Sequence, residues 1–214
     1  MTIQYELICG DARDVIKSMP TGSVGVCVTD PPYGIGKDYG ADPDSWRPGQ
    51  DFWREVYRVL DADGSLHMTV SNKHLPYWLK EVTDAGFIYM HTSVYWNTTR
   101  VAGNWNGQFA YAWEPILHFK KLHFKLCGRM YTDVFEHTGK KETDYPAERD
   151  YSAWYKLMDL LPGNPVLDPF MGSGTSGVVC AKIDRDFIGI EKDPVCFEKA
   201  RTRIENAVNQ GVLL

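Results

Sequence analysis

Asp30, Pro31, Pro32 and Tyr33 follow the apolar run SVGVCVT in this chain of 214 residues. A strand must end here, because neither proline can donate a backbone hydrogen bond to a neighbouring strand. The acid is thereby left at the carboxyl end of a buried strand, which is where α/β proteins bind their ligands. A stiff turn with Tyr33 covering the core is the alternative interpretation.

The stretch VLDPFMGSGTSG joins a second apolar run to a helix through a glycine turn. Gly172 and Gly174 let the backbone pass close to a ligand. Thr175 and the free amides of the helix start offer donors to an anionic group such as a carboxylate. Asp168 offers an acceptor to a cation such as an ammonium group. Taken alone, such a turn is equally consistent with a tight connection.

Glu191 ends the next apolar run, FIGIE, about 20 residues further along. In nucleotide-binding folds an acid at this position binds ribose hydroxyl groups. A ribose, an ammonium and a carboxylate together describe S-adenosylmethionine better than a dinucleotide.

Strands and helices alternate at both ends of the sequence, which predicts an α/β fold with a mostly parallel sheet flanked by helices. The stretches 87–96 and 109–121 predict an antiparallel hairpin near the sheet edge. DADG, at 61–64, is expected to break the chain between a helix and a strand. The remaining strands are expected at 5–11, 23–29, 65–70, 164–170 and 185–191. The helices are expected at 12–20, 51–60, 74–85, 151–161, 176–183 and 194–209.

The composition is that of a globular protein, with 43% hydrophobic and 24% charged residues and a net charge of −5. No apolar run approaches the roughly 20 residues that span a membrane. The amino terminus lacks the build of a signal peptide. Five scattered cysteines without a C-x-x-C pair are expected to be reduced thiols in a cytoplasmic protein, and a structural zinc site is not expected.

The motifs TDPPYGIG, LDPFMGSGT and FIGIE together resemble those of the amino-group DNA methyltransferases, which methylate the exocyclic nitrogen of adenine or cytosine. The catalytic motif precedes the cofactor motif, as in the β group of that family. The resemblance covers nearly the whole chain and implies a Rossmann-like methyltransferase fold that uses S-adenosyl-L-methionine. It also implies a single domain, 1–214, with a catalytic half (1–121), a short target-recognition segment (122–144) and a cofactor-binding half (145–214).

The resemblance implies roles for individual residues. Asp30 and the Pro31 carbonyl would accept the two hydrogens of the target amino group, Pro32 would stiffen the turn, and Tyr33 would stack on the flipped base. Arg149 stands where the family often has a lysine. The residues implied in cofactor binding are Asp11, Ala12, Asp30, Arg149, Asp168, Pro169, Phe170, Gly172, Ser173, Gly174, Thr175, Glu191 and Lys192.

Basic and amide side chains are candidates for contacts with DNA. The strip HFKKLHFKLCGR contains no acid, although protective lysines at a solvated strand edge would give the same pattern. Trp96 and Trp113 are expected to pack the sheet edge, and His67, His74 and His91 to be structural. The candidate DNA-binding residues are Lys37, Arg47, Arg100, Asn104, Asn106, Lys120, Lys121 and Lys125.

The aspartate form of the tetrapeptide goes mostly with adenine in the family, so adenine N6 in double-stranded DNA is the expected target. The alternatives are cytosine N4, an RNA target, and a non-catalytic subunit that binds the cofactor. The resemblance also implies a homodimer on DNA, since one small protomer would cover little of the duplex. No metal or membrane partner is expected, and the protein is expected to be cytoplasmic, in a bacterium or encoded by a phage.

Overall fold

The computed structural model describes residues 4–34, 46–97, 112–125, 132–137 and 150–211. Within these residues no helix is long and apolar enough to cross a membrane.

The described strands form one eight-stranded sheet in the order β1-β8-β7-β2-β3-β5-β4-β6. The first five strands of this order are parallel, β5 is antiparallel to both β3 and β4, and β6 is parallel to β4. The strands are β1 (Tyr5–Cys9), β2 (Val24–Thr29), β3 (Leu60–Thr69), β4 (Ile88–Asn97), β5 (Trp113–Lys120), β6 (Val134–His137), β7 (Val166–Asp168) and β8 (Phe187–Glu191).

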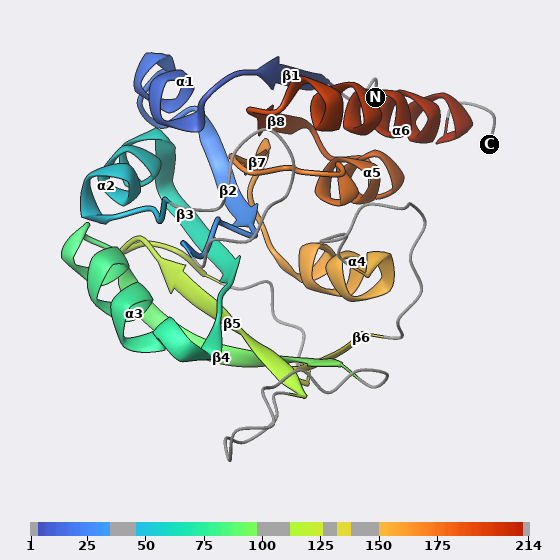
Figure 1. The fold of residues 1–214 in the computed structure, drawn as a ribbon. Coiled ribbons are helices and arrows are strands. Elements are labelled where there is room, and N and C mark those ends of the chain that lie inside the picture. Colours follow the sequence, from blue (N-terminus) through green and yellow to red (C-terminus); the bar gives the residue numbers. More distant parts are fainter. Residues whose placement is uncertain (1–3, 35–45, 98–111, 126–131, 138–149, 212–214) are drawn as a thin grey trace.

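Helices cover both faces of this sheet, with α1, α2 and α3 on one side and α4, α5 and α6 on the other (Figure 1). The helices are α1 (Ala12–Ser18), α2 (Gln50–Val59), the short 3-10 helix η1 (Asn72–His74), α3 (Leu75–Asp84), α4 (Tyr151–Leu160), α5 (Thr175–Lys182) and α6 (Pro194–Gly211). The predicted α/β fold with a mostly parallel sheet is confirmed.

Strand β2 lies at the centre of the sheet and is buried along its whole length. Its alternate residues serve the two faces, since Cys27 packs into one core cluster while Val26 and Val28 pack into the other. A parallel strand covered on both faces is expected to be continuously apolar, as SVGVCVT is. Because core side chains cover both faces of β2, the polar residues that follow this strand lie at the edge of the sheet.

The structure differs from the sequence prediction in two elements. Strand β3 begins at Leu60, so DADG lies within the strand, where its pairing with β2 shifts register between Val24 and Val26. A bulged pairing accommodates the polar residues that the pattern treats as a break. The four-residue strand β6, which the pattern did not indicate, pairs with β4 on the outer side of the β4–β5 hairpin.

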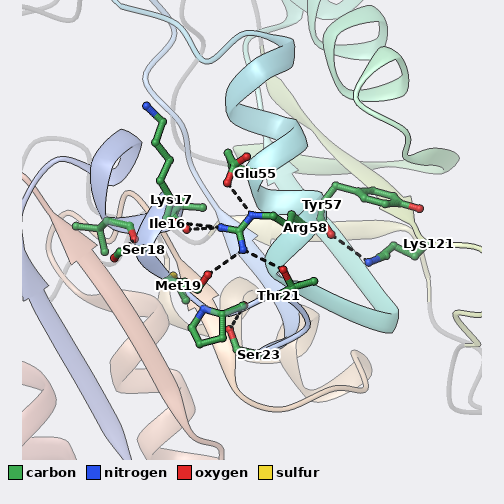
Figure 2. A network of polar contacts seen from close by, with 12 residues as sticks. Ile16, Lys17, Ser18, Met19, Thr21, Ser23, Glu55, Tyr57, Arg58 and Lys121 are labelled. Carbon is green, nitrogen blue, oxygen red and sulfur yellow. Dashed lines mark hydrogen bonds and ion pairs between the residues drawn. The ribbon is translucent and has the colours of Figure 1, made fainter.

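A polar network fixes α1 and α2 to each other (Figure 2). The Arg58 guanidinium on α2 donates hydrogen bonds of 2.8 Å to the carbonyls of Ile16 and Met19 at the end of α1, and it pairs with Glu55 at 2.8 Å. The last carbonyls of a helix have no intrahelical partner and carry partial negative charge, so a cation there is favourable. This network fixes the helix that follows β1.

Candidate active site

Asp30 follows β2 at the carboxyl edge of the sheet, and two hydroxyl groups hold its carboxylate. Thr69, the last residue of the neighbouring strand β3, donates a hydrogen bond of 2.5 Å to Asp30 Oδ1. The Tyr33 hydroxyl donates a second one of 2.7 Å to the same oxygen. The Asp30 carboxylate is therefore fixed in position and kept as an acceptor. Thr69 is not predicted from the sequence, because a threonine at a strand end carries no signal of its own.

Pro31 is buried and Pro32 half-buried, and the chain leaves the sheet here as the prolines predict. The half-buried Tyr33 ring meets the Trp78 ring of α3 edge-on, with centroids 6.4 Å apart, and packs against the core on that side. Tyr33 thus borders both the core and the Asp30 carboxylate.

Asp168 ends β7, the strand next to β2, and is buried. It accepts hydrogen bonds from the Thr29 hydroxyl at 2.8 Å, the Ser176 hydroxyl at 2.6 Å and the Phe170 amide at 3.1 Å. The pKa of Asp168 is raised to about 6, mainly by burial and in smaller part by the charge of Asp30, and the hydrogen bonds from Ser176, Thr29 and Phe170 oppose the rise. A carboxylate has about four acceptor positions, so these bonds leave one for a ligand.

The turn after Asp168 requires glycine. Gly172 and Gly174 have φ angles of +51° and +80°, a backbone region that side chains disfavour. A Cβ at Gly174 would also lie 3.0 Å from the Ala200 Cβ of α6. The turn delivers the Gly172 amide to Glu191, which accepts a hydrogen bond of 3.0 Å from it and one of 2.8 Å from the Asp193 amide. Burial raises the pKa of Glu191.

Asp11 follows β1 after Gly10 and is the N-cap of α1, where its side chain accepts a hydrogen bond of 2.9 Å from the Arg13 amide. The Arg13 side chain also hydrogen-bonds this carboxylate and holds its pKa below the usual value, with Lys192 contributing charge. The Arg13 guanidinium lies 5.1 Å from the centroid of the Trp46 ring, which in turn packs 6.1 Å from the Phe170 ring.

Four neighbouring strands, β1, β8, β7 and β2, thus present Asp11, Glu191, Asp168 and Asp30 in that order along one edge of the sheet. Acceptors for ribose hydroxyls and for an ammonium lie beside a glycine turn that opens a helix, which fits the groups of S-adenosyl-L-methionine. Among the described residues no group of three histidine, cysteine or acidic side chains could hold a metal ion. The predicted cofactor-binding residues that the structure places in these strand ends and the segments following them are Asp11, Ala12, Asp30, Asp168, Pro169, Phe170, Gly172, Ser173, Gly174, Thr175, Glu191 and Lys192.

Comparison with known proteins identifies the family. The model of a DNA methylase family, N6_N4_Mtase, matches residues 24–159 and 157–202. The chain belongs to this family. Its cofactor is S-adenosyl-L-methionine.

The chain is similar in sequence to a known methyltransferase and in fold to two solved structures. The type II methyltransferase M.HpaI of Haemophilus parainfluenzae is 28% identical over 241 residues, covering 97% of this chain and 76% of the relative. The structure of an M1.HpyAVI–SAM complex superimposes with a TM-score of 0.74 at 22% identity, covering 94% of this chain and all of the other. The cytosine-N4-specific PvuII DNA methyltransferase superimposes with a TM-score of 0.77 at 17% identity, covering 100% and 94% of the two chains.

The lysines of the predicted basic strip do not lie near Asp30. Strand β5 runs antiparallel to β3 and pairs Lys120 with Ser65, so these described lysines lie at the end of β5 and after it, at the opposite edge of the sheet. The Lys121 ammonium donates to the Tyr57 carbonyl at 3.1 Å and to the Leu60 carbonyl at 2.8 Å (the first bond is drawn in Figure 2). Lys121 therefore caps the end of α2.

Arg47 is the one predicted DNA-binding residue that the structure both describes and places on the Asp30 side. Its guanidinium lies 4.2 Å from the centroid of the Tyr77 ring, and its charge helps to lower the pKa of the nearby His74. The other predicted site residues lie outside the described residues, namely Lys37, Arg100, Asn104, Asn106 and Arg149.

The predicted packing of Trp96 and Trp113 at the sheet edge is wrong, since these two residues are 44% and 39% exposed. The expectation that histidines are structural fits His67, which is buried and bonded through Nδ1 to Nδ1 of the buried His118 at 2.7 Å. His91 is exposed and lies 3.2 Å from Asp133.

Proposed function

We propose that this DNA methyltransferase methylates the N6 amino group of an adenine that is flipped out of the duplex. The observation that carries the proposal is the Asp30 carboxylate, held by Thr69 and Tyr33 beside the cofactor-binding edge. An exocyclic amino group inside a duplex is out of reach of such a pocket, so the base must leave the stack.

The residues of the tetrapeptide act on the amino nitrogen, whose lone pair is delocalised into the ring of the base. Asp30 accepts one hydrogen bond from the amino group, and the Pro31 carbonyl accepts the other. Acceptors placed out of the ring plane favour a pyramidal nitrogen, whose lone pair is free to attack. The two prolines and the Thr69 hydroxyl fix these acceptors before the base arrives, which is electrostatic preorganisation. Tyr33 stacks on the base.

The cofactor-binding residues orient the methyl donor. Asp168 would accept a hydrogen bond from its ammonium group, Glu191 would bind its ribose hydroxyls, and the glycine turn would meet its carboxylate. When bound, S-adenosyl-L-methionine supplies the electrophilic methyl group. Alignment of the amino nitrogen with that group provides much of the acceleration.

The choice of adenine rests on the aspartate at position 30, since the aspartate form of the tetrapeptide goes mostly with adenine in the family. The fold does not decide between the bases, because the cytosine-N4-specific PvuII enzyme has the same architecture. Cytosine N4 is therefore the second candidate. We further propose a single-domain, cytoplasmic protein, bacterial or phage-encoded, that acts on double-stranded DNA as a homodimer.

Methyl incorporation tests the proposal. The purified chain, incubated with duplex DNA and methyl-labelled S-adenosyl-L-methionine, should label the DNA. The variant Asp30→Ala should lose this activity while binding the cofactor with nearly unchanged affinity in calorimetry. Labelling by Asp30→Ala at the rate of the unmodified chain would refute the mechanism. No labelling by the unmodified chain, with intact cofactor binding, would support the non-catalytic alternative.

A further inference from the structure

Two exposed tryptophans lie side by side at the end of the β4–β5 hairpin. Trp96 and Trp113 are register partners on adjacent antiparallel strands, so their side chains point to the same face of the sheet. The Cβ atoms of such partners lie about 5 Å apart. Single exposed apolar residues are ordinary, but adjoining large aromatic side chains form a patch of the kind that marks an interaction site.

This pair lies at the same edge of the sheet as Asp30. Thr69, which holds Asp30, pairs with Ile116 of β5. Trp113 stands three residues before Ile116 on the antiparallel strand, which is about 10 Å further out along the sheet. The side-chain amide of Asn72 donates a hydrogen bond of 2.8 Å to the Trp113 carbonyl, which connects the hairpin to η1.

Charge is distributed unevenly around the tryptophans. The exposed Lys73 follows Asn72 in η1, and it lies with Arg47 close enough to His74 for both charges to lower the pKa of that histidine, in addition to its burial. On the other side, the exposed Glu136 of β6 is the register partner of Trp96. A phosphate is therefore favoured on the η1 side and disfavoured beside Trp96, where an uncharged aromatic group fits.

We propose that Asn72, Lys73, Trp96, Trp113 and Glu136, here named the tryptophan surface, bind the DNA next to the target base. Lys73 contacts a backbone phosphate, and the two indole rings stack on a base that the opened duplex leaves unstacked. The inference rests on the proposed function, since it takes the flipped base at Asp30 as its reference point. It assigns the DNA contact to the edge opposite to the lysine strip.

Fluorescence anisotropy with a labelled duplex, measured with the full chain at several salt concentrations, tests this surface. Trp96→Ala and Trp113→Ala should each weaken binding roughly 5- to 100-fold without changing the salt dependence, because stacking involves no counterion release. Lys73→Gln should reduce the slope of log affinity against log salt by about one.

Matched variants at the far edge are the controls. Tyr89→Ala removes an equally exposed aromatic ring from the other end of β4, and it should leave DNA affinity unchanged. Lys125→Gln tests the lysine strip directly. DNA binding that depends on Lys125 and not on Lys73 or the tryptophans would overturn the inference.

Two further outcomes separate this surface from the proposed function. Methylation by the unmodified chain, with DNA affinity unaffected in all three surface variants, would overturn the surface alone. Loss of DNA affinity in the tryptophan variants, with no methylation by the unmodified chain, would overturn the function alone. Sedimentation identifies the competing occupant, because a dimer that dissociates in Trp96→Ala with unchanged DNA affinity would assign the surface to a second copy of the chain.

Discussion

The affinity for S-adenosyl-L-methionine should fall as the pH is lowered through 6, because Asp168 must be ionised to accept the cofactor's ammonium group. Burial raises the pKa of Asp168 to about 6. At pH 5 about nine-tenths of the unliganded protein carries a proton on this carboxyl, and that proton must leave on binding. The dissociation constant should therefore increase about tenfold between pH 7 and pH 5, which is about 1.4 kcal/mol.

Calorimetry measures this directly. Titrations at pH 7 and pH 5, in buffers of different ionisation enthalpy, give both the affinity and the number of protons released. About one proton should be released at pH 5 and almost none at pH 7. The variant Asp168→Asn should bind more weakly at pH 7 and lose this pH dependence. Its amide is accommodated because the Ser176 hydroxyl, which donates to Asp168 now, can turn to accept.

Protonation of Asp168 does not unfold the protein, so unfolding through this group cannot be the cause of the weaker cofactor binding at low pH. An acid whose pKa is raised in the folded state binds more protons there than in the unfolded chain, so acidification towards pH 5 stabilises the fold through this group. Burial also raises the pKa of Glu191, the second buried acid of the site. The variant Glu191→Gln is the control for the contribution of this group to the pH dependence of cofactor affinity. An affinity that is constant from pH 7 to pH 5, or an unchanged pH dependence in Asp168→Asn, would refute the reasoning.

Two further predictions concern buried polar side chains, namely Thr69 and the histidine pair His67 and His118. Thr69→Val removes the 2.5 Å donor of Asp30 and should lower kcat at least about tenfold with unchanged cofactor affinity, whereas Thr69→Ser should keep most activity. Thr92→Val, the same change on β4, is the control, and equal kcat in the two valine variants would contradict a positioning role for Thr69. Burial lowers the pKa of His118 to about 4, so this neutral histidine stabilises the fold above pH 6.5 and loses that contribution as the pH falls. Urea unfolding at pH 7 and pH 5 should show the unmodified chain losing at least about 2 kcal/mol more than the double variant His67→Phe, His118→Leu, because burial lowers the pKa of both histidines, and equal losses would contradict the assignment.

The sequence predicts the candidate site well because that site depends on strand ends. Apolar runs locate the parallel strands, and the residues that follow them must meet at one edge of the sheet. The positions of Asp30, Asp168 and Glu191 at strand ends therefore follow from the sequence without knowledge of the strand order. Gly174 was recognised because its left-handed conformation requires glycine.

The pairing direction of β5 explains what the sequence could not predict. The basic strip looks suited to DNA, but its residue Lys120 lies on an antiparallel partner of β3, which carries that lysine to the edge away from Asp30. The same pairing brings Trp113 to the Asp30 edge, although its aromatic character predicts packing. Thr69 acquires its contact with Asp30 only through the pairing of β2 with β3, which brings together two residues 39 positions apart in the sequence.

The identity of the methylated nucleoside is the most direct test of the central claim. Duplex DNA is incubated with the purified chain and S-adenosyl-L-methionine, digested to nucleosides and measured by mass spectrometry beside a reaction with Asp30→Ala. The account predicts N6-methyladenine from the unmodified chain and none from the variant. N4-methylcytosine in its place, or no methylated nucleoside at all, would contradict it.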